Sequence, residues 1–94
     1  MTRYTVTETP QFAASLRKLD REASRRIMRR LYALADLDDP RVRCKPLTGP
    51  LAGLWRLRVD DYRAILDLQA DALVIVALDA GHRSKIYDTF TRPQ

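Results

Sequence analysis

The chain has 94 residues, which is enough for one domain with a modest hydrophobic core. Seventeen Lys and Arg residues outnumber twelve Asp and Glu residues, and fourteen of the seventeen are arginine. One cysteine excludes an internal disulfide, the first ten residues lack the apolar run of a secretion signal, and the longest apolar run, residues 72–78, is too short to cross a bilayer. We therefore expect a single cytoplasmic domain over residues 1–94, without membrane association, whose arginines favour a phosphate-bearing partner.

The chain begins with a predicted strand and a predicted helix. Residues 4–8 are predicted as a short strand, because Val6 lies between threonines. Thr9 and Pro10 are residue types that favour the N-cap and the first position of a helix. An apolar stripe at spacings of four and three follows them and supports a helix. That stripe consists of Phe12, Leu16 and Leu19.

A second helix is predicted directly after the first. Asp20 is suited to cap it, and its apolar stripe continues to about Leu37. The run at residues 38–40, Asp-Asp-Pro, predicts its end. Two helices joined this closely form a hairpin, which must bury its apolar side against the rest of the chain.

The second half of the chain predicts a small sheet. Residues 41–53 are predicted as a loop because they are rich in Pro and Gly, and three strands are predicted over residues 54–59, 62–68 and 73–79. Such short connections require antiparallel neighbours. The third strand is apolar on both faces and is expected in the middle of the sheet. The predicted class is α+β, with the N-terminal strand and helical hairpin packed on one face of an antiparallel sheet.

Three arginines are predicted to share one face of this sheet. Side chains alternate along a strand, so Arg56 and Arg58 lie on the face opposite Trp55, Leu57 and Val59. If residues 60–61 form a two-residue turn, Arg58 also lies opposite Arg63. Like charges directly opposite each other destabilise the sheet by up to about 1 kcal/mol. Selection for folding alone would place an acid at one of these positions, so the pair favours an anion-binding face. The alternative is a solvated face neutralised by Asp67 and Asp79.

The third strand is followed by a run of polar and charged residues. Gly81, His82 and Arg83 come first, and Lys85 and Tyr87 follow closely. A loop at the end of a strand is a common place for functional side chains, so this loop is expected to carry part of a site. The alternative is a plain turn with a surface histidine.

Taken together, these features resemble the RelE/ParE superfamily of bacterial toxins from toxin–antitoxin modules. The order of strand, helical hairpin and three-stranded sheet covers nearly the whole chain. The sharper similarity lies in four short runs and one single residue, which are Lys45-Pro46-Leu47, Gly53-Leu54-Trp55-Arg56-Leu57-Arg58, Asp61-Tyr62-Arg63, Gly81-His82-Arg83 and Tyr87. The resemblance implies a small RelB-like antitoxin as partner, and contact with operator DNA only through that antitoxin.

The superfamily has two branches with different targets. RelE-like toxins are endoribonucleases that cut mRNA in the ribosomal A site, whereas ParE-like toxins poison DNA gyrase. Because Arg63, Arg83 and Tyr87 are all present, the chain resembles the RelE branch. That resemblance implies a metal-independent mRNA endoribonuclease that acts on the ribosome and inhibits translation. A ParE-like gyrase inhibitor and a non-catalytic nucleic-acid-binding module are the alternatives.

The resemblance also implies a catalytic set for RNA cleavage by the neighbouring 2′-hydroxyl. This reaction needs a base, stabilisation of the charged phosphorane and an acid for the leaving 5′-oxygen. Tyr87 is the implied base, and Arg56 and Arg63 are implied to hold the phosphate. Arg83 would serve the leaving oxygen. His82 is a second candidate for that role, because histidine exchanges protons near neutral pH.

One position departs from the family pattern, since Leu54 stands where the best-studied type has a lysine. Further contacts to RNA phosphates are predicted for Lys45, Arg58 and Lys85. No metal ion or other cofactor is expected, because one histidine and one cysteine without a carboxylate cluster do not make a usual zinc site. The second helix also carries five arginines, which either form a solvated face or contact ribosomal RNA or an acidic antitoxin segment. They are Arg21, Arg25, Arg26, Arg29 and Arg30.

Overall fold

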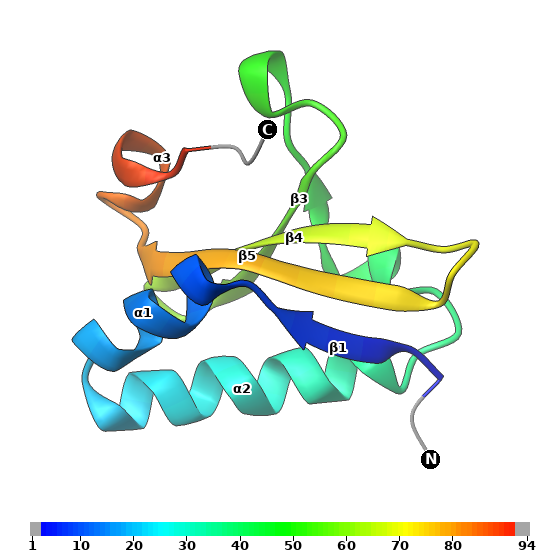
Figure 1. Cartoon of the computed structure of the whole chain (residues 1–94), viewed down its shortest axis with the longest axis horizontal. Coiled ribbons are helices and arrows are strands. Elements are labelled where there is room, and N and C mark those ends of the chain that lie inside the picture. The colour runs from blue at the N-terminus through cyan, green and yellow to red at the C-terminus, as the bar shows by residue number, and fades with distance from the viewer. Residues whose placement is uncertain (1–2, 92–94) are drawn as a thin grey trace.

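The computed structural model describes residues 3–91, which form one mixed sheet with helices on both faces (Figure 1). The strands are β1 (Thr5–Glu8), β2 (Lys45–Pro46), β3 (Trp55–Val59), β4 (Tyr62–Gln69) and β5 (Val74–His82). The α-helices are α1 (Pro10–Lys18), α2 (Arg21–Ala35) and α3 (Ile86–Thr89). Two short 3-10 helices, η1 (Pro40–Arg43) and η2 (Gly49–Leu51), lie between α2 and β3. None of the helices in this part of the chain has the length and apolar character of a bilayer span.

The predicted α+β class is confirmed, and β5 lies in the interior of the sheet as expected. The strand order is β1-β5-β4-β3-β2, with antiparallel pairing from β5 to β2. The prediction of an antiparallel sheet is wrong for β1, which is parallel to β5. The connection between these two strands runs through the helical hairpin and then through β2, β3 and β4, so it is far longer than the dozen residues that a parallel pair requires.

The loop predicted over residues 41–53 contains a fifth strand, which the sequence did not reveal. β2 has only two residues, and Lys45 and Pro46 pair with Arg56 and Trp55 of β3. It is an edge strand, where proline is tolerated because one side of the backbone has no ladder partner. Two residues are too few for side-chain alternation to be recognised in a sequence.

Both predicted helix caps are confirmed. The Thr9 hydroxyl accepts a hydrogen bond from the Phe12 amide at 3.1 Å, and the Asp20 carboxylate accepts one from the Ala23 amide at 3.3 Å. Capping of this kind satisfies amides that have no partner inside the helix. The two caps therefore fix where α1 and α2 begin, and the apolar sides of both helices then face the sheet.

Two hydrophobic cores lie on the two faces of the sheet. The larger one lies between the sheet and the helical hairpin, and its largest fully buried side chains are Phe12, Ile27, Leu31, Leu34, Leu66 and Ile75. The smaller core lies on the opposite face and attaches α3 to the sheet (Figure 1). Its members are Leu54, Ile65, Leu78, Ile86 and Phe90. Because β5 contributes to both cores, its sequence is apolar on both faces.

Cys44 is half-buried beside the larger core, and burial raises the pKa of its thiol from 9.0 to about 11. Because only the thiolate reacts, we expect a disulfide reagent at pH 8 to label the folded chain about 100-fold more slowly than the urea-unfolded chain. A raised pKa in the folded state also means that this group's contribution to stability is complete below pH 9 and is lost as the pH rises through 11. Equal labelling rates for folded and unfolded chain would contradict this assignment.

Candidate functional site

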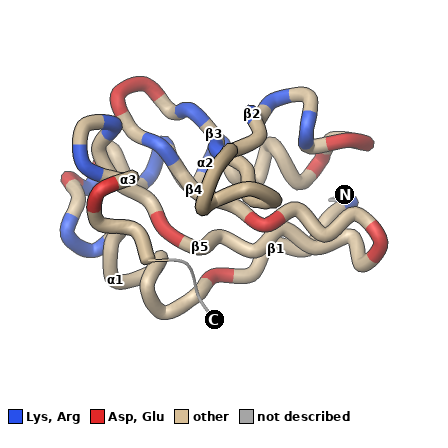
Figure 2. The backbone as a smooth tube through the Cα atoms, turned by 90° about the horizontal axis from the view of Figure 1, so that it is seen from above, with Lys and Arg blue, Asp and Glu red and all other residues tan. Residues whose placement is uncertain are grey.

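Four basic side chains lie on the sheet face that is turned away from α1 and α2. Directly opposite residues of antiparallel strands share a face, and Lys45 is opposite Arg56 while Arg58 is opposite Arg63. Leu57, between the two β3 arginines, is buried in the core on the other side. We call these four residues, Lys45, Arg56, Arg58 and Arg63, the basic face. Figure 2 shows the basic positions of β2, β3 and β4 on neighbouring strands.

The basic face is not neutralised by Asp67 or Asp79. Asp79 is buried and hydrogen-bonded to α1, and Asp67 accepts a hydrogen bond from the Gln69 amide group at 3.0 Å. Within residues 3–91, no ion pair involves Lys45, Arg56, Arg58 or Arg63. These side chains therefore keep their charges available for a ligand.

The two-residue turn between β3 and β4 has the predicted register, with Val59 opposite Tyr62. Asp60 adopts φ 55°, the left-handed conformation that such a tight turn requires and that Asp tolerates better than most residues. The Arg63 guanidinium curls back to this turn and donates to the carbonyl oxygens of Asp60 and Tyr62, each at 2.8 Å. The turn thus holds one of the predicted catalytic arginines in a fixed place.

The same turn also holds Arg83. Its backbone amide donates to the Asp61 carbonyl oxygen at 2.8 Å, and its Nε lies 3.8 Å from the Asp61 carboxylate. The side chain remains largely exposed, so this ion pair is weak and exchangeable. Arg63 and Arg83 therefore meet at one turn, although they are twenty residues apart in the sequence.

Helix α3 brings Tyr87 to this side of the sheet. Ile86 and Phe90 anchor α3 in the smaller core, and Tyr87 between them is 38% exposed. The first residue of α3 packs on Gly81, since a methyl group added there would lie 3.3 Å from the side-chain atom Cδ1 of Ile86 and 3.9 Å from its Cα. Gly81 is the strand partner of Arg63. The absence of a side chain at Gly81 thus lets α3 sit next to the Arg63 end of the basic face.

His82 does not join the basic face. It is opposite Tyr62, whose ring packs against the larger core, and the two rings meet edge to face with centroids 5.7 Å apart. Its Nδ1 accepts a hydrogen bond from the Ser84 amide at 3.2 Å. Lys85 lines a cavity of about 720 Å³ together with His82, between α1 and the end of β5. The structure therefore brings together Lys45, Arg56, Arg58 and Arg63, with Arg83 and Tyr87 beside them, and places His82 and Lys85 toward α1.

Leu54, at the position where a lysine was expected, is buried in the smaller core under α3. It supports α3 by packing and offers no proton. Within residues 3–91, no group of three or more His, Cys, Asp or Glu side chains could hold a metal ion.

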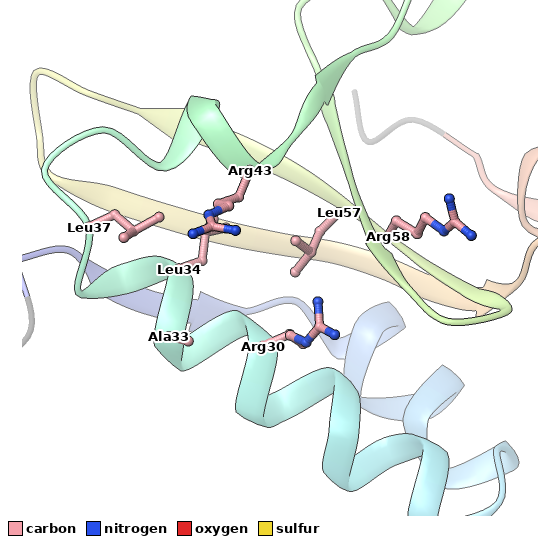
Figure 3. A pocket seen from close by; sticks show the side chains of 7 residues that line it. All are labelled: Arg30, Ala33, Leu34, Leu37, Arg43, Leu57 and Arg58. Atoms are coloured by element: carbon pink, nitrogen blue, oxygen red, sulfur yellow. The ribbon is translucent and has the colours of Figure 1, made fainter.

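A groove next to the basic face was not foreseen from the sequence. It lies between α2 and β3, has a volume of about 530 Å³, and is shown in Figure 3. Its apolar lining and its basic lining come from segments far apart in the chain, which is why no local pattern signals it. The apolar residues are Ala33, Leu34, Leu37 and Leu57, and the basic residues are Arg30, Arg43 and Arg58.

The arginines of α2 have different surroundings. Arg30 lines the groove, while Arg26 lies 3.1 Å from the Asp60 carboxylate and links α2 to the β3–β4 turn. The exposed Arg21, Arg25 and Arg29 make no ion pair within the described part of the chain. The helix therefore has one structural arginine, and the others are open to solvent or a partner.

This fold, with a helical hairpin on one sheet face and a basic face on the other, is that of a toxin from a type II toxin–antitoxin system. The family model for the ParE toxin of these systems, parDE, matches residues 6–87. The chain belongs to this family, within the RelE/ParE superfamily. A search of curated proteins finds no match.

Solved structures of RelE toxins are similar to most of this chain. The RelBE2 toxin–antitoxin complex of Mycobacterium tuberculosis gives 27% identity and a TM-score of 0.79, over 90% of this chain and 97% of that chain. The RelE–RelB complex of Pyrococcus horikoshii gives 28% identity and a TM-score of 0.68, over 88% and 98%. A free mutant of Escherichia coli RelE gives 20% identity and a TM-score of 0.70, over 94% and 93%, and shares the fold.

The facing pair Arg58 and Arg63 has a measurable consequence for stability. We expect Arg58→Thr to raise the free energy of unfolding by about 0.2–1 kcal/mol, because it removes a like charge from across the strand pair. Urea unfolding measures this change, and Arg58→Lys, which keeps the charge, should leave stability within about 0.5 kcal/mol of the wild type. A destabilised Arg58→Thr variant would contradict the electrostatic account.

Proposed function

We propose that this toxin is a ribosome-dependent endoribonuclease that cuts mRNA in the A site and thereby inhibits translation. The observation that carries the proposal is the strand register, which gathers Lys45, Arg56, Arg58 and Arg63 on one face of the sheet. A single-stranded RNA backbone requires such a row of cations. The similarity to RelE structures and the presence of Arg83 and Tyr87 next to that row favour cleavage over binding alone.

In the proposed reaction, the 2′-oxygen forms a bond to the adjacent phosphorus and the bond from phosphorus to the 5′-oxygen breaks. Tyr87, reacting as a phenolate, takes the proton of the 2′-hydroxyl and becomes a neutral phenol, while Arg56 and Arg63 stabilise the charge on the phosphorane. Arg83 stabilises the departing 5′-oxygen, which takes a proton from water. The products are a 2′,3′-cyclic phosphate and a free 5′-hydroxyl.

His82 is a weaker candidate for the leaving-group acid than its sequence position implied, because its ring packs against Tyr62 on the α1 side of β5. We expect His82→Ala to retain more than half of the wild-type cutting rate. A loss of about 100-fold or more would return the acid role to His82.

Inhibition of DNA gyrase is the second candidate, because the matching family model is that of the ParE toxin. One pair of assays separates the two functions. Primer extension on an mRNA in a purified translation system should give new stops only when both ribosomes and the protein are present. Unchanged mRNA together with inhibited supercoiling by purified gyrase would overturn the proposed function and establish the second candidate. A basic module without catalysis would bind RNA and give neither signal.

We further propose that the groove beside α2 receives a segment of the cognate RelB-like antitoxin in which apolar and acidic residues are combined. Its apolar residues would cover Leu34, Leu37 and Leu57, and its acidic residues would meet Arg30 and Arg43. The structurally similar RelE chains of Mycobacterium and Pyrococcus come from complexes with an antitoxin. Operator DNA would be contacted only through the antitoxin.

The groove makes a direct prediction for antitoxin affinity. Arg30→Glu is expected to raise the dissociation constant by about 10-fold or more, because it places like charges in contact. Arg29→Glu is the matched control, since Arg29 is exposed on the neighbouring position of α2 and does not line the groove. Titration calorimetry with the cognate antitoxin measures both. Equal losses for the two variants would show that net charge alone is responsible.

A further inference from the structure

The buried carboxylate of Asp79 has no role in the site described so far. It is 3% exposed and is the one charged side chain in the buried class among residues 3–91. It accepts hydrogen bonds from Ser15 Oγ at 2.5 Å, from Gln11 Nε2 at 3.0 Å and from the Ala80 amide at 2.8 Å. Burying a charge is costly unless its hydrogen bonds are complete, and three donors meet that requirement here without a cation.

Asp79 lies at an irregularity in β5. Ile65 is opposite Asp79 while the next residue of β4, Leu66, is opposite Ala77, so Leu78 is an extra residue in β5. This is a β-bulge. Thr9 donates two hydrogen bonds to carbonyl oxygens at this bulge. Its amide donates to the Ala77 oxygen at 3.1 Å, and its hydroxyl donates to the Leu78 oxygen at 2.9 Å. The bulge is therefore fastened to the start of α1 by Thr9 and to the body of α1 by Asp79.

The bulge decides which side chains of β5 face the basic side of the sheet. Ala77 and Ala80, three residues apart, both pack in the larger core, so the alternation is shifted by one residue between them. As a result Gly81 faces α3 and His82 faces away. Without the bulge, His82 would face Ile86 in place of Gly81. An imidazole ring has no room there, since even a methyl group on Gly81 would lie 3.3 Å from Ile86 Cδ1.

This part of β5 is paired with β4 as far as His82, but its other edge has no strand partner among residues 3–91. Its pairing with β1 ends at Ala77, and the cavity of about 720 Å³ lies between α1 and the residues that follow. The hydrogen bonds of Asp79 cross to α1 beside that cavity. Beyond Gly81 the chain continues directly into Arg83 and α3. A change in the position of the bulge would therefore move both of them.

From these observations we infer that Asp79 is a positioning residue for cleavage. It holds the β5 bulge against α1, so that Gly81 rather than His82 lies beneath α3, and so that Arg83 and Tyr87 reach the basic face. This inference rests on the proposed ribonuclease function, and it names a residue that touches neither the RNA nor the reacting atoms.

The test uses Asp79→Asn and Asp79→Ala in the full-length chain, assayed on ribosomes programmed with mRNA. We expect the maximal cutting rate to fall by about 10- to 100-fold, as for a misplacement of about 1 Å, while the ribosome concentration for half-maximal rate stays within about twofold. Asp67→Asn is the matched control and should cut normally, because within residues 3–91 the Asp67 carboxylate is hydrogen-bonded to Gln69 alone. Gln11→Ala removes one of the hydrogen-bond donors to Asp79, and Gln11 is exposed on α1. This variant should fold even if the Asp79 variants fold poorly, and its cutting rate should fall by less than theirs.

A double-mutant cycle separates positioning from plain destabilisation. If Asp79 acts by placing Arg83 and Tyr87, the part of its effect that depends on Arg83 disappears with that side chain, so Asp79→Asn should cost at least about threefold less in an Arg83→Ala background than in the wild type. If Asp79→Asn only lowered the fraction of folded protein, its loss in cutting rate would be the same with and without Arg83. Equal losses in the two backgrounds would therefore overturn the inference. Wild-type cutting rates for Asp79→Asn and Gln11→Ala would also overturn it.

Amide exchange keeps the inference testable even if the wild type does not cut RNA. The Ala80 amide is bonded to the Asp79 carboxylate and the Phe90 amide to the Ile86 carbonyl of α3. We expect both to exchange at least about 10-fold faster in Asp79→Asn, while amides of α2 are unchanged. Unchanged exchange at Ala80 and Phe90 would show that Asp79 does not hold this segment. Absence of cutting by the wild type would count against the proposed function alone.

Discussion

Arg83→Ala is expected to lower the maximal rate of mRNA cutting on ribosomes by about 100- to 1,000-fold, with little change in ribosome affinity. A cation that meets charge only as the leaving oxygen departs acts on the transition state and not on binding, and losing one such donor has this magnitude. The Arg83 side chain is mostly exposed and its ion pair with Asp61 is long, at 3.8 Å. The fold should therefore tolerate the change, with a free energy of unfolding within about 0.5 kcal/mol of the wild type.

Single-turnover primer extension measures this effect, and growth arrest on expression in cells gives a second readout. Arg41→Ala is the matched control, because Arg41 is an exposed, ion-paired arginine on η1, outside the proposed site. The control should arrest growth as the wild type does. A cutting rate for Arg83→Ala within about threefold of the wild type would remove Arg83 from the proposed mechanism.

Ile86→Ala is expected to abolish cutting almost completely while leaving most of the fold intact. Ile86 is 1% exposed and anchors α3 to the smaller core, and its truncation costs about 2–5 kcal/mol. A helix of four residues has no stability of its own, so this cost falls on the attachment of α3. With α3 detached, Tyr87 would no longer reach the RNA, and the loss should match that of Tyr87→Phe. We expect the cutting rate of Tyr87→Phe to fall by about 100- to 10,000-fold if Tyr87 is the base.

The attachment of α3 can be followed independently of activity. Chymotrypsin should cleave after Tyr87 much faster in Ile86→Ala than in the wild type, whereas the amides of α2 should keep their slow hydrogen exchange. Ile86→Val, which removes one methyl group, should cost about 0.5–1.5 kcal/mol and retain most of the activity. Full activity with a detached α3 would show that Tyr87 has no part in the reaction.

Several features of this protein follow from the sequence because they depend on neighbouring residues. Thr9 and Asp20 marked the helix starts, since capping involves atoms only three residues apart. The β3–β4 register followed from the two-residue turn and from side-chain alternation, and it placed Arg58 opposite Arg63 as predicted. The same local logic identified the basic face, apart from Lys45, whose strand is too short to be seen.

Other features depend on contacts between distant segments, and only the tertiary structure decided them. The parallel pairing of β1 with β5 joins residues that are 69 positions apart, and alternation along β1 says nothing about its partner. The groove beside α2 combines residues of α2, η1 and β3.

The face of His82 is the clearest case. Counting alternately from Ile75 would put it on the basic face, but the bulge at Leu78 shifts the alternation and turns it toward Tyr62. The sequence thus determined which basic side chains the sheet can present to a ligand. The packing of α1 against Asp79 and of α3 over Gly81 determined which of them meet, because a bulge is stabilised by partners more than sixty residues away.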